Sequence, residues 1–154
     1  MLKSYRRGPG CEANGFTLIE LMVVVAIIAI LASIVAPRMV QRAEKAKRAA
    51  ARVQIANFKT ALINFRMDTG DFPTTDQGLE ALIKRPTGYD GKYQEGGYLD
   101  SDSVPLDPWR NRYVYICPGI HDRSGYDIES YGKDGADGGQ GDDEDIESWH
   151  LQED

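Results

Sequence analysis

Cysteine and histidine are scarce in this chain, which has two of each among 154 residues. Cys11 and Cys117 lie on opposite sides of a long apolar segment. A membrane would therefore separate them, and we expect no disulfide. His121 follows Cys117 closely, but they flank a Pro-Gly pair and no orienting acid is suggested for a thiol nucleophile. Zinc-ligand spacing and a glycine-rich phosphate loop are missing too, so we expect no enzyme.

A basic surface of the kind that binds nucleic acid is also missing, because the formal net charge is −6. The charges are unevenly placed along the chain. Residues 38–52 carry six basic residues and one acid, whereas the stretch from Asp127 to the end carries eleven acids and one lysine. An acidic chain with an acidic tail argues against nucleic acid as a partner.

One long apolar segment covers residues 16–36 and carries a single charge, Glu20. A helix of this length spans about 30 Å, the thickness of the hydrocarbon core of a bilayer. The segment is longer than the apolar core of a cleaved signal peptide, which has about 7–15 residues. Ile34 and Pro37 also make its end a poor cleavage site. We therefore expect a retained single-pass membrane anchor with a short leader ahead of it.

The sequence GFTLIE, with basic residues before it and the apolar run after it, resembles the class III signal of type IV pilins and pseudopilins. The resemblance implies that a prepilin peptidase removes residues 1–15 by cutting between Gly15 and Phe16, and then methylates the Phe16 amine. It also implies that Glu20 pairs with the Phe16 amine of a neighbouring subunit during assembly. Position alone supports equally well a carboxylate tolerated at the lipid interface, because a charge costs less near a helix end.

Basic residues around the apolar segment favour the opposite orientation, since three precede it and six follow it. By the positive-inside rule, the C-terminal part would be cytoplasmic. The resemblance implies a cytoplasmic leader, residues 16–36 across the bacterial inner membrane, and residues 37–154 in the periplasm. We adopt the second orientation because the cleavage motif is more specific than a count of charges.

A helix is predicted to continue from about residue 37 to 68, where alanine and long polar side chains dominate, with Pro37 as a candidate kink. Its apolar residues form two stripes on nearly opposite sides. The heavier core stripe should face the domain's own core. The lighter outer stripe is left for small loops or, as we expect, for other subunits of a fibre. The core stripe is Ala51, Ile55, Phe58, Leu62 and Phe65, and the outer stripe is Val53, Ala56, Thr60, Ile63 and Met67.

The rest of the chain predicts a small antiparallel sheet. Thr74 and Gln77 form a capping-box pattern before a short helix that Pro86 ends. A strand is predicted at residues 113–117, and the alternating stretch GYDIESY is its partner. The predicted fold is α+β and pilin-like, with a long N-terminal helix packed on a small antiparallel β-sheet.

Three further segments narrow the resemblance. DFPTTDQGLEALI, GGYL and VPLDPW are similar to the major pseudopilin of the type II secretion system, the G-type subunit. That family usually reads DPWGNPY, whereas this chain has Arg110 and Arg112 in place of the glycine and the proline, so its turn need not be the family's. The lone Cys117 departs from type IV pilins, which usually close a C-terminal loop with a disulfide.

Acids and glycines crowd together in SYGKDGADGGQGDDEDI. Oxygen ligands on a flexible glycine loop suit Ca²⁺ rather than Zn²⁺, although Ala136 occupies a position where an EF-hand has a ligand. By composition alone, a solvated acidic tail explains the stretch slightly better. The resemblance implies a structural calcium in this loop. Its ligands would be the side chains of Asp134, Asp142 and Asp143 and the carbonyls of Tyr131 and Gln140.

The resemblance implies a structural subunit that polymerises into the periplasmic pseudopilus and drives folded proteins across the outer membrane. Its partners would be further copies of itself, minor pseudopilins, the inner-membrane assembly platform and the prepilin peptidase. Two alternatives are a type IV pilin of a surface fibre and a monomeric membrane-anchored periplasmic domain that binds calcium or a glycan. The missing disulfide-closed loop counts against the first, and the outer stripe counts against the second.

Overall fold

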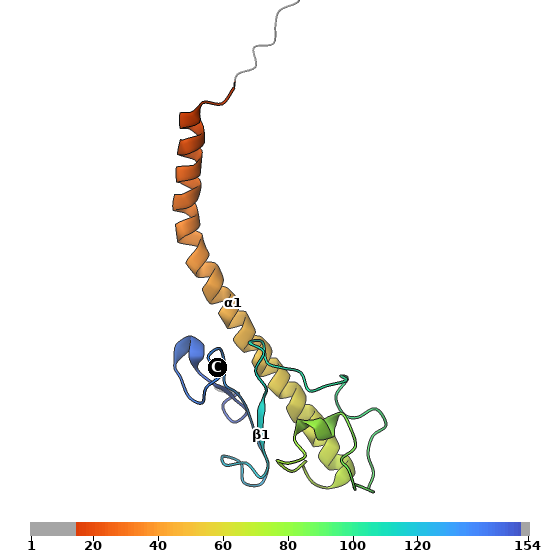
Figure 1. Ribbon diagram of the computed structural model, residues 1–154. Coiled ribbons are helices and arrows are strands. Elements are labelled where there is room, and N and C mark those ends of the chain that lie inside the picture. Colours follow the sequence, from red (N-terminus) through yellow and green to blue (C-terminus); the bar gives the residue numbers. More distant parts are fainter. Residues whose placement is uncertain (1–14, 152–154) are drawn as a thin grey trace, which may run out of the picture. The chain divides into compact units, whose positions relative to one another are not determined.

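The computed structural model describes residues 15–151, which belong to two compact units. The first unit ends at Val40 and the second begins at Gln41. Helix α1, Leu18–Thr69, contributes to both (Figure 1). Apart from Gly15, the predicted leader with its cysteine lies outside the described residues, as do residues 152–154.

Helix α1 begins with a capping box. The backbone N–H and the hydroxyl of Thr17 both donate to Oε2 of Glu20, each at 2.8 Å. The N–H of Glu20 donates in return to Oγ1 of Thr17 at 3.3 Å. These bonds pair groups that the first turn of a helix otherwise leaves without partners, and so they define where α1 starts.

In the first unit, the described side chains of α1 are exposed, and those of residues 21–33 are apolar or small on every side of the helix. Leu18 is 76% exposed, and even Val23, among the least exposed of its large apolar residues, is 51% exposed. Among residues 15–151, α1 is the one helix with a stretch long and apolar enough to cross a membrane, judged by length and composition. The helix continues through Pro37 to Thr69.

In the second unit, α1 buries one face against the rest of the domain. Every residue of the core stripe is between 0% and 4% exposed, which confirms the predicted buried face. Phe58 meets Tyr113 edge-on with ring centroids 5.0 Å apart, and Phe65 meets Tyr98 in the same way at 5.3 Å. Such aromatic pairs contribute about 0.5–1.5 kcal/mol each beyond the burial of their area.

The outer stripe is exposed along its whole length. Val53 is 61% exposed, Ile63 51% and Met67 79%, and Ala56 and Thr60 are exposed as well. Within the part of the chain that the structure describes, no loop covers this face. The alternative in which small loops of the same subunit cover the outer stripe is therefore wrong.

The sheet has three antiparallel strands in the order β1-β2-β3: β1 (Val114–Ile116), β2 (Asp127–Ser130) and β3 (Ile146–Glu147). Tyr115 lies opposite Ile128, and Ser130 lies opposite Ile146. The first two strands were predicted, although β1 is shorter than residues 113–117. The third was not predicted, because two residues are too few to show an alternating pattern. We call residues 131–145, which connect β2 to β3, the acidic loop.

The predicted capping box at Thr74 also forms. Oε1 of Gln77 accepts from the N–H of Thr74 at 2.9 Å, and Oγ1 of Thr74 accepts from the N–H of Gln77 at 3.3 Å. The helix that follows is the short 3₁₀ helix η1, Leu79–Leu82, which ends before Pro86. Its leucines are buried in the core.

Asp107 stabilises the turn that contains Arg110 and Arg112. In the related sequences, which usually read DPWGNPY, these two positions are a glycine and a proline. Its Oδ1 accepts from the N–H groups of Trp109 at 3.0 Å and Asn111 at 2.7 Å. Arg110 adopts a φ of 75°, a left-handed conformation that costs an L-residue about 1–2 kcal/mol. The buried Asp107 carboxylate therefore holds a turn in which an arginine takes a conformation that normally favours glycine.

Candidate functional sites

The predicted processing site lies at the exposed start of the first unit. Phe16 is 92% exposed, and a Cβ built on Gly15 would have no heavy atom within 4 Å. Glu20, four residues further on, is engaged locally as the cap of α1. The interpretation of the sequence missed this role, although Thr17 and Glu20 have the spacing of a capping box. Cleavage after Gly15, methylation of Phe16 and pairing of Glu20 with a second subunit stay predictions.

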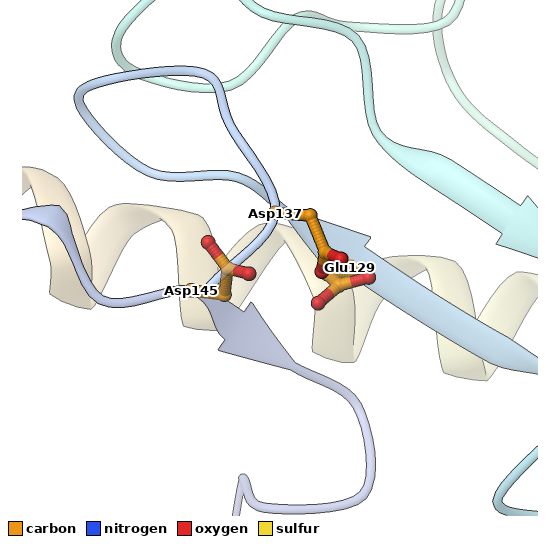
Figure 2. A group of neighbouring side chains, drawn as sticks. All are labelled: Glu129, Asp137 and Asp145. Carbon is orange, nitrogen blue, oxygen red and sulfur yellow. The ribbon is translucent and has the colours of Figure 1, made fainter. Parts of the chain in front are cut away.

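Three carboxylates converge beside the acidic loop in the second unit. Figure 2 shows Glu129 from β2, Asp137 from the loop and Asp145 from the residue before β3, with their side chains turned toward one another. One carboxylate oxygen from each lies within 4.8 Å of the others. In the described residues, this is the group of acidic, histidine or cysteine side chains with the geometry to hold a metal ion.

Strand pairing and one glycine explain this arrangement. Because β2 and β3 are antiparallel neighbours, Asp145 at the entrance to β3 comes to lie beside Glu129 of β2. The loop between them turns back at Gly139, whose φ is 100°. A Cβ there would lie 2.2 Å from the carbonyl oxygen of Asp143, so only glycine fits this close approach.

Burial and mutual repulsion make negative charge on these three carboxylates unfavourable. Burial, and after it the negative charges of Asp145 and Glu147, raise the pKa of Glu129 to about 7. Burial also raises the pKa of Asp145, although its Oδ2 accepts from the N–H of Gly138 at 2.7 Å. Its Oδ1 is buried without a hydrogen-bond partner among the described residues. A cation among these oxygens would relieve the repulsion and satisfy the buried atom, and hard oxygen donors suit Ca²⁺.

The ligands inferred from the resemblance lie near this group but do not belong to it. Asp134 is exposed, and its Oδ1 accepts from the N–H of Ala136 at 3.2 Å. Asp142 and Asp143 form part of the 3₁₀ turn η2, Gly141–Asp143. The carbonyl of Tyr131 accepts from Gly135 at 3.1 Å, and that of Gln140 accepts from Asp143 at 3.4 Å. This predicted ligand set stays a prediction.

Sequence reasoning passed over Glu129 as a ligand because it belongs to a predicted strand rather than to the acidic stretch. Asp145 was inside that stretch but was not selected. The pattern that would have found Glu129 is an acid within a strand that leads directly into an acid-rich loop. Because the strand after the loop pairs antiparallel with the strand before it, such a residue lies close to the last residues of the loop.

Arg48 of α1 ties the acidic loop to the helix. Its Nη1 donates to the carbonyl of Glu144 at 2.6 Å, and its Nη2 lies 3.0 Å from the carboxylate of the same residue. The Arg48 side chain is only 14% exposed. The contact fixes the backbone between Asp143 and Asp145, so the helix helps to shape the loop.

Cys117 and His121 have separate partners in the structure. The Cys117 thiol donates to the carbonyl of Gly125 at 3.5 Å. The His121 ring stacks on Trp149 at 3.9 Å, and its Nδ1 lies 3.2 Å from the buried Asp127. Neither contact joins the thiol to the imidazole, so these residues give no support to a thiol nucleophile activated by a histidine.

An apolar N-terminal helix with an acid, Glu20, in its first turn, followed by a helix-on-sheet domain, defines the class of pilin-like subunits. Residues 12–36 match the model of the prokaryotic N-terminal methylation motif. Residues 38–149 match the model of the family described as type II secretion system (T2SS), protein G. The chain belongs to this family.

Named relatives support the assignment. The chain is 44% identical over 143 residues to the type II secretion system core protein G of Vibrio cholerae serotype O1, covering 92% of this chain and 95% of that protein. It is 42% identical over 140 residues to the protein of the same name from Pseudomonas aeruginosa, covering 90% and 96%. The crystal structure of the major pseudopilin from the type 2 secretion system of enterohaemorrhagic Escherichia coli matches with a TM-score of 0.60 and 32% identity, over 71% of this chain and 88% of that one.

Proposed function

We propose that this chain is a structural subunit that polymerises into the pseudopilus of a type II secretion system. Membership of the protein G family supports a pseudopilin, and the observation that carries the polymer is the exposed outer stripe. Contiguous apolar side chains exposed on one face of a domain mark a surface that packs against a partner. A further copy of the same chain supplies a matching apolar helix, so that packing of α1 against α1 builds a fibre.

The first unit supplies the membrane anchor in this proposal. Residues 16–36 span the inner membrane as a single pass, and residues 37–154 lie in the periplasm, where the fibre drives folded proteins across the outer membrane. A prepilin peptidase prepares the subunit by cutting after Gly15. Minor pseudopilins and the inner-membrane assembly platform are the proposed partners in assembly.

Replacement of Ile63 by aspartate tests the polymer. Ile63 belongs to the outer stripe and is 51% exposed, so Ile63→Asp should leave the melting temperature of the full-length chain close to that of wild type. Fibres should be lost in electron micrographs, and secretion should stop. Lys84→Asp, an exposed change away from the stripe, is the matched control and should assemble normally. Normal fibres from Ile63→Asp would refute the proposal.

We further propose that the acidic loop binds a structural calcium ion. Glu129, Asp137 and Asp145 are the carboxylates already gathered, and the unpartnered oxygen of Asp145 supports their role. The bound ion would supply the positive charge that these residues lack and thereby hold the loop closed. The additional proposed ligands are Asp134, Asp142, Asp143 and the carbonyls of Tyr131 and Gln140.

Melting of the full-length chain with calcium, with magnesium and with chelator tests this site. A hundredfold excess of calcium over Kd adds about 2.7 kcal/mol, which is a shift on the order of 10–20 °C for a domain of this size. Asp145→Asn should remove most of the shift in melting temperature. Asp134→Asn separately tests the ligands that the resemblance implies. Asp100→Asn, an exposed acid outside the loop, is the control. Equal melting temperatures of wild type in calcium and in chelator would refute the calcium site and favour a solvated acidic segment.

A further inference from the structure

One edge of the sheet in the second unit has unpaired backbone groups. Strand β1 is at the end of the order β1-β2-β3, so it pairs with β2 on one side only. Ile128 of β2 turns its backbone the other way: its N–H donates to Oγ of Ser148 at 3.0 Å, and its carbonyl accepts from the N–H of Ser148 at 2.9 Å. Tyr115 of β1 lies opposite Ile128. By the alternation of antiparallel pairing, its N–H and carbonyl therefore point away from β2.

Cys117, the next residue with this orientation, shows how such groups are satisfied elsewhere on the edge. Its N–H donates to Oγ1 of Thr75 at 2.9 Å, and its carbonyl accepts from the same hydroxyl at 3.0 Å. The hydroxyl takes the place that a neighbouring strand would have. The N–H and carbonyl of Tyr115 have no such partner among residues 15–151. Unpaired groups of this kind are a template for a further strand.

A pocket of about 450 Å³ lies beside this edge, and we call it the edge pocket. Tyr113, Tyr115 and Thr75 line it, whereas none of its described lining residues comes from β2 or β3, so it lies on the unpaired side of β1. Its other walls come from η1 with adjacent residues and from residues 102–106. Leu106 in this wall is 51% exposed. The volume is within the range of about 300–1,000 Å³ that is usual for ligand sites.

A buried hydroxyl in the wall of the edge pocket also needs a partner. Tyr113 is 8% exposed, and its hydroxyl oxygen is buried without a hydrogen-bond partner among the described residues. Burial, and after it the negative charge of Asp107, raise the pKa of Tyr113, so the hydroxyl keeps its proton and can donate. The Tyr115 hydroxyl, by contrast, donates to the carbonyl of Pro73 at 2.7 Å. Buried polar groups are normally paired, so the Tyr113 hydroxyl favours an occupant that offers an acceptor.

Charge at the edge pocket favours neither sign of ligand. Glu80 and Asp102 line the pocket together with Lys84 and Arg112, and all four residues are exposed. Two acids and two bases cancel, so an occupant is selected by backbone hydrogen bonds and by an apolar side chain. These are the features by which proteins add an extended peptide to a sheet edge.

We propose that the edge pocket binds an extended segment of another protein, which adds to the sheet as a fourth strand beside Tyr115. The main chain of the segment pairs with the N–H and carbonyl of Tyr115, an apolar side chain enters the pocket, and an acceptor meets the Tyr113 hydroxyl. A single segment fits between η1 and residues 102–106, whereas the sheet edge of a second folded copy would bring its whole domain against these walls. The inference uses neither the outer stripe nor the acidic loop, so it goes beyond the proposed fibre.

A five-residue peptide of alternating threonine and valine, acetylated and amidated at its ends, is the probe. Nuclear magnetic resonance of the full-length chain in neutral detergent measures hydrogen exchange at the Tyr115 amide. Exchange should be fast in the free chain and should slow at least about tenfold with millimolar peptide. The same peptide methylated on its three central amide nitrogens keeps the side chains but cannot pair as a strand. It should give no protection.

Variants of the walls test the pocket separately from the edge. Leu106→Asp places a charge in the pocket and should weaken peptide binding at least about tenfold. Ile120→Asp, a change at a residue that is 70% exposed and outside the pocket, is the matched control and should bind as wild type does. Tyr113→Phe removes only the hydroxyl and should weaken binding about two- to tenfold, as the loss of one hydrogen bond does.

Three outcomes would overturn the proposal. Slow exchange of the Tyr115 amide in the free chain would show that the edge is already paired, and unchanged exchange with millimolar peptide would show that it accepts no strand. Equal protection by the methylated peptide would show apolar adhesion in place of strand pairing.

A second copy of the chain is the competing occupant. Protection of the Tyr115 amide that rises with protein concentration in the absence of peptide would assign the edge to that copy and overturn the proposal. Ile63→Asp should bind the peptide as wild type does, so a failure of the fibre and a failure of the edge pocket are distinguishable.

Discussion

The two units of this chain use the same helix for different surroundings. In the first unit, α1 is apolar all round between residues 21 and 33, and its described large apolar side chains are half or more exposed. In the second unit, α1 buries the core stripe to 4% exposure or less and leaves the outer stripe uncovered. Both units therefore form a helix, and they differ in how apolar side chains are distributed around it. That distribution indicates what each part of the helix packs against. A helix that is apolar on all sides requires an apolar medium, whereas a helix with two stripes requires two separate packing surfaces.

A change at the predicted cleavage point affects the first unit alone and should have the largest effect. Glycine has no Cβ, so the peptidase can approach its backbone closely, and Gly15→Phe should block that approach. We expect essentially all of the chain to keep its 15-residue leader, measured by the intact mass of protein from the membrane fraction. Gly10→Phe, inside the leader, should be processed normally. Wild-type protein that still begins at Met1 would contradict the cleavage prediction.

Glu20 allows the capping role and the assembly role to be separated. Glu20→Gln keeps an amide oxygen for the capping box but removes the charge that would pair with a neighbour's Phe16 amine. Glu20→Val removes both. If charge pairing matters, each variant should accumulate as processed subunit and form at least about tenfold fewer fibres, the size of effect expected for a lost charged contact of about 1.4 kcal/mol or more.

Normal assembly of Glu20→Gln together with failure of Glu20→Val would show that the carboxylate acts only as a helix cap. Normal assembly of both variants would show that fibre assembly does not require Glu20. Counting fibres by electron microscopy and processed subunit by immunoblot distinguishes these outcomes.

The two stripes of the second unit should respond differently to truncation. Phe58 is fully buried, so Phe58→Ala should lower the free energy of unfolding by about 3–5 kcal/mol. Met67 on the outer stripe is 79% exposed, and Met67→Ala should change it by no more than about 0.5 kcal/mol. Urea denaturation of the full-length chain measures both. Similar losses from the two variants would mean that the outer stripe is covered within a single subunit.

The smallest expected effect is a pH dependence in the second unit without metal. The pKa of Glu129 is raised from 4.5 to about 7, so the folded chain binds a proton there more tightly than the unfolded chain. The resulting stability is fully present below pH 4.5 and is lost as the pH rises through about 7. The raised pKa of Asp145 acts in the same direction.

Urea midpoints in chelator should therefore fall as the pH rises through this window, and Glu129→Gln should flatten the profile. Asp68 and Asp127 have lowered pKa values, and their contributions are lost only at lower pH. Saturating calcium should abolish the dependence between pH 4.5 and about 7 if Glu129 is a ligand, because the bound ion would keep its carboxylate deprotonated. A flat profile for the metal-free wild type would argue against close contact of the three carboxylates.

Local and periodic features could be read directly from the sequence. The apolar segment, the two stripes and the capping box at Thr74 depend on spacing along a single element, and the structure confirms the stripes and the cap. The strands β1 and β2 were recognisable because alternation persists over several residues. The role of Glu20 as a cap is equally local, because Thr17 and Glu20 have the spacing of a capping box.

Contacts between distant parts of the chain could not be read in this way. The meeting of Glu129 with Asp145, the tie from Arg48 to the acidic loop and the burial of Glu44 under Trp109 each join residues from different elements. No period or spacing encodes such a meeting, because it depends on how the sheet pairs and where the helix lies against it. Tertiary packing brought three of the many acids together, and among the described residues it left one oxygen of Asp145 buried without a hydrogen-bond partner.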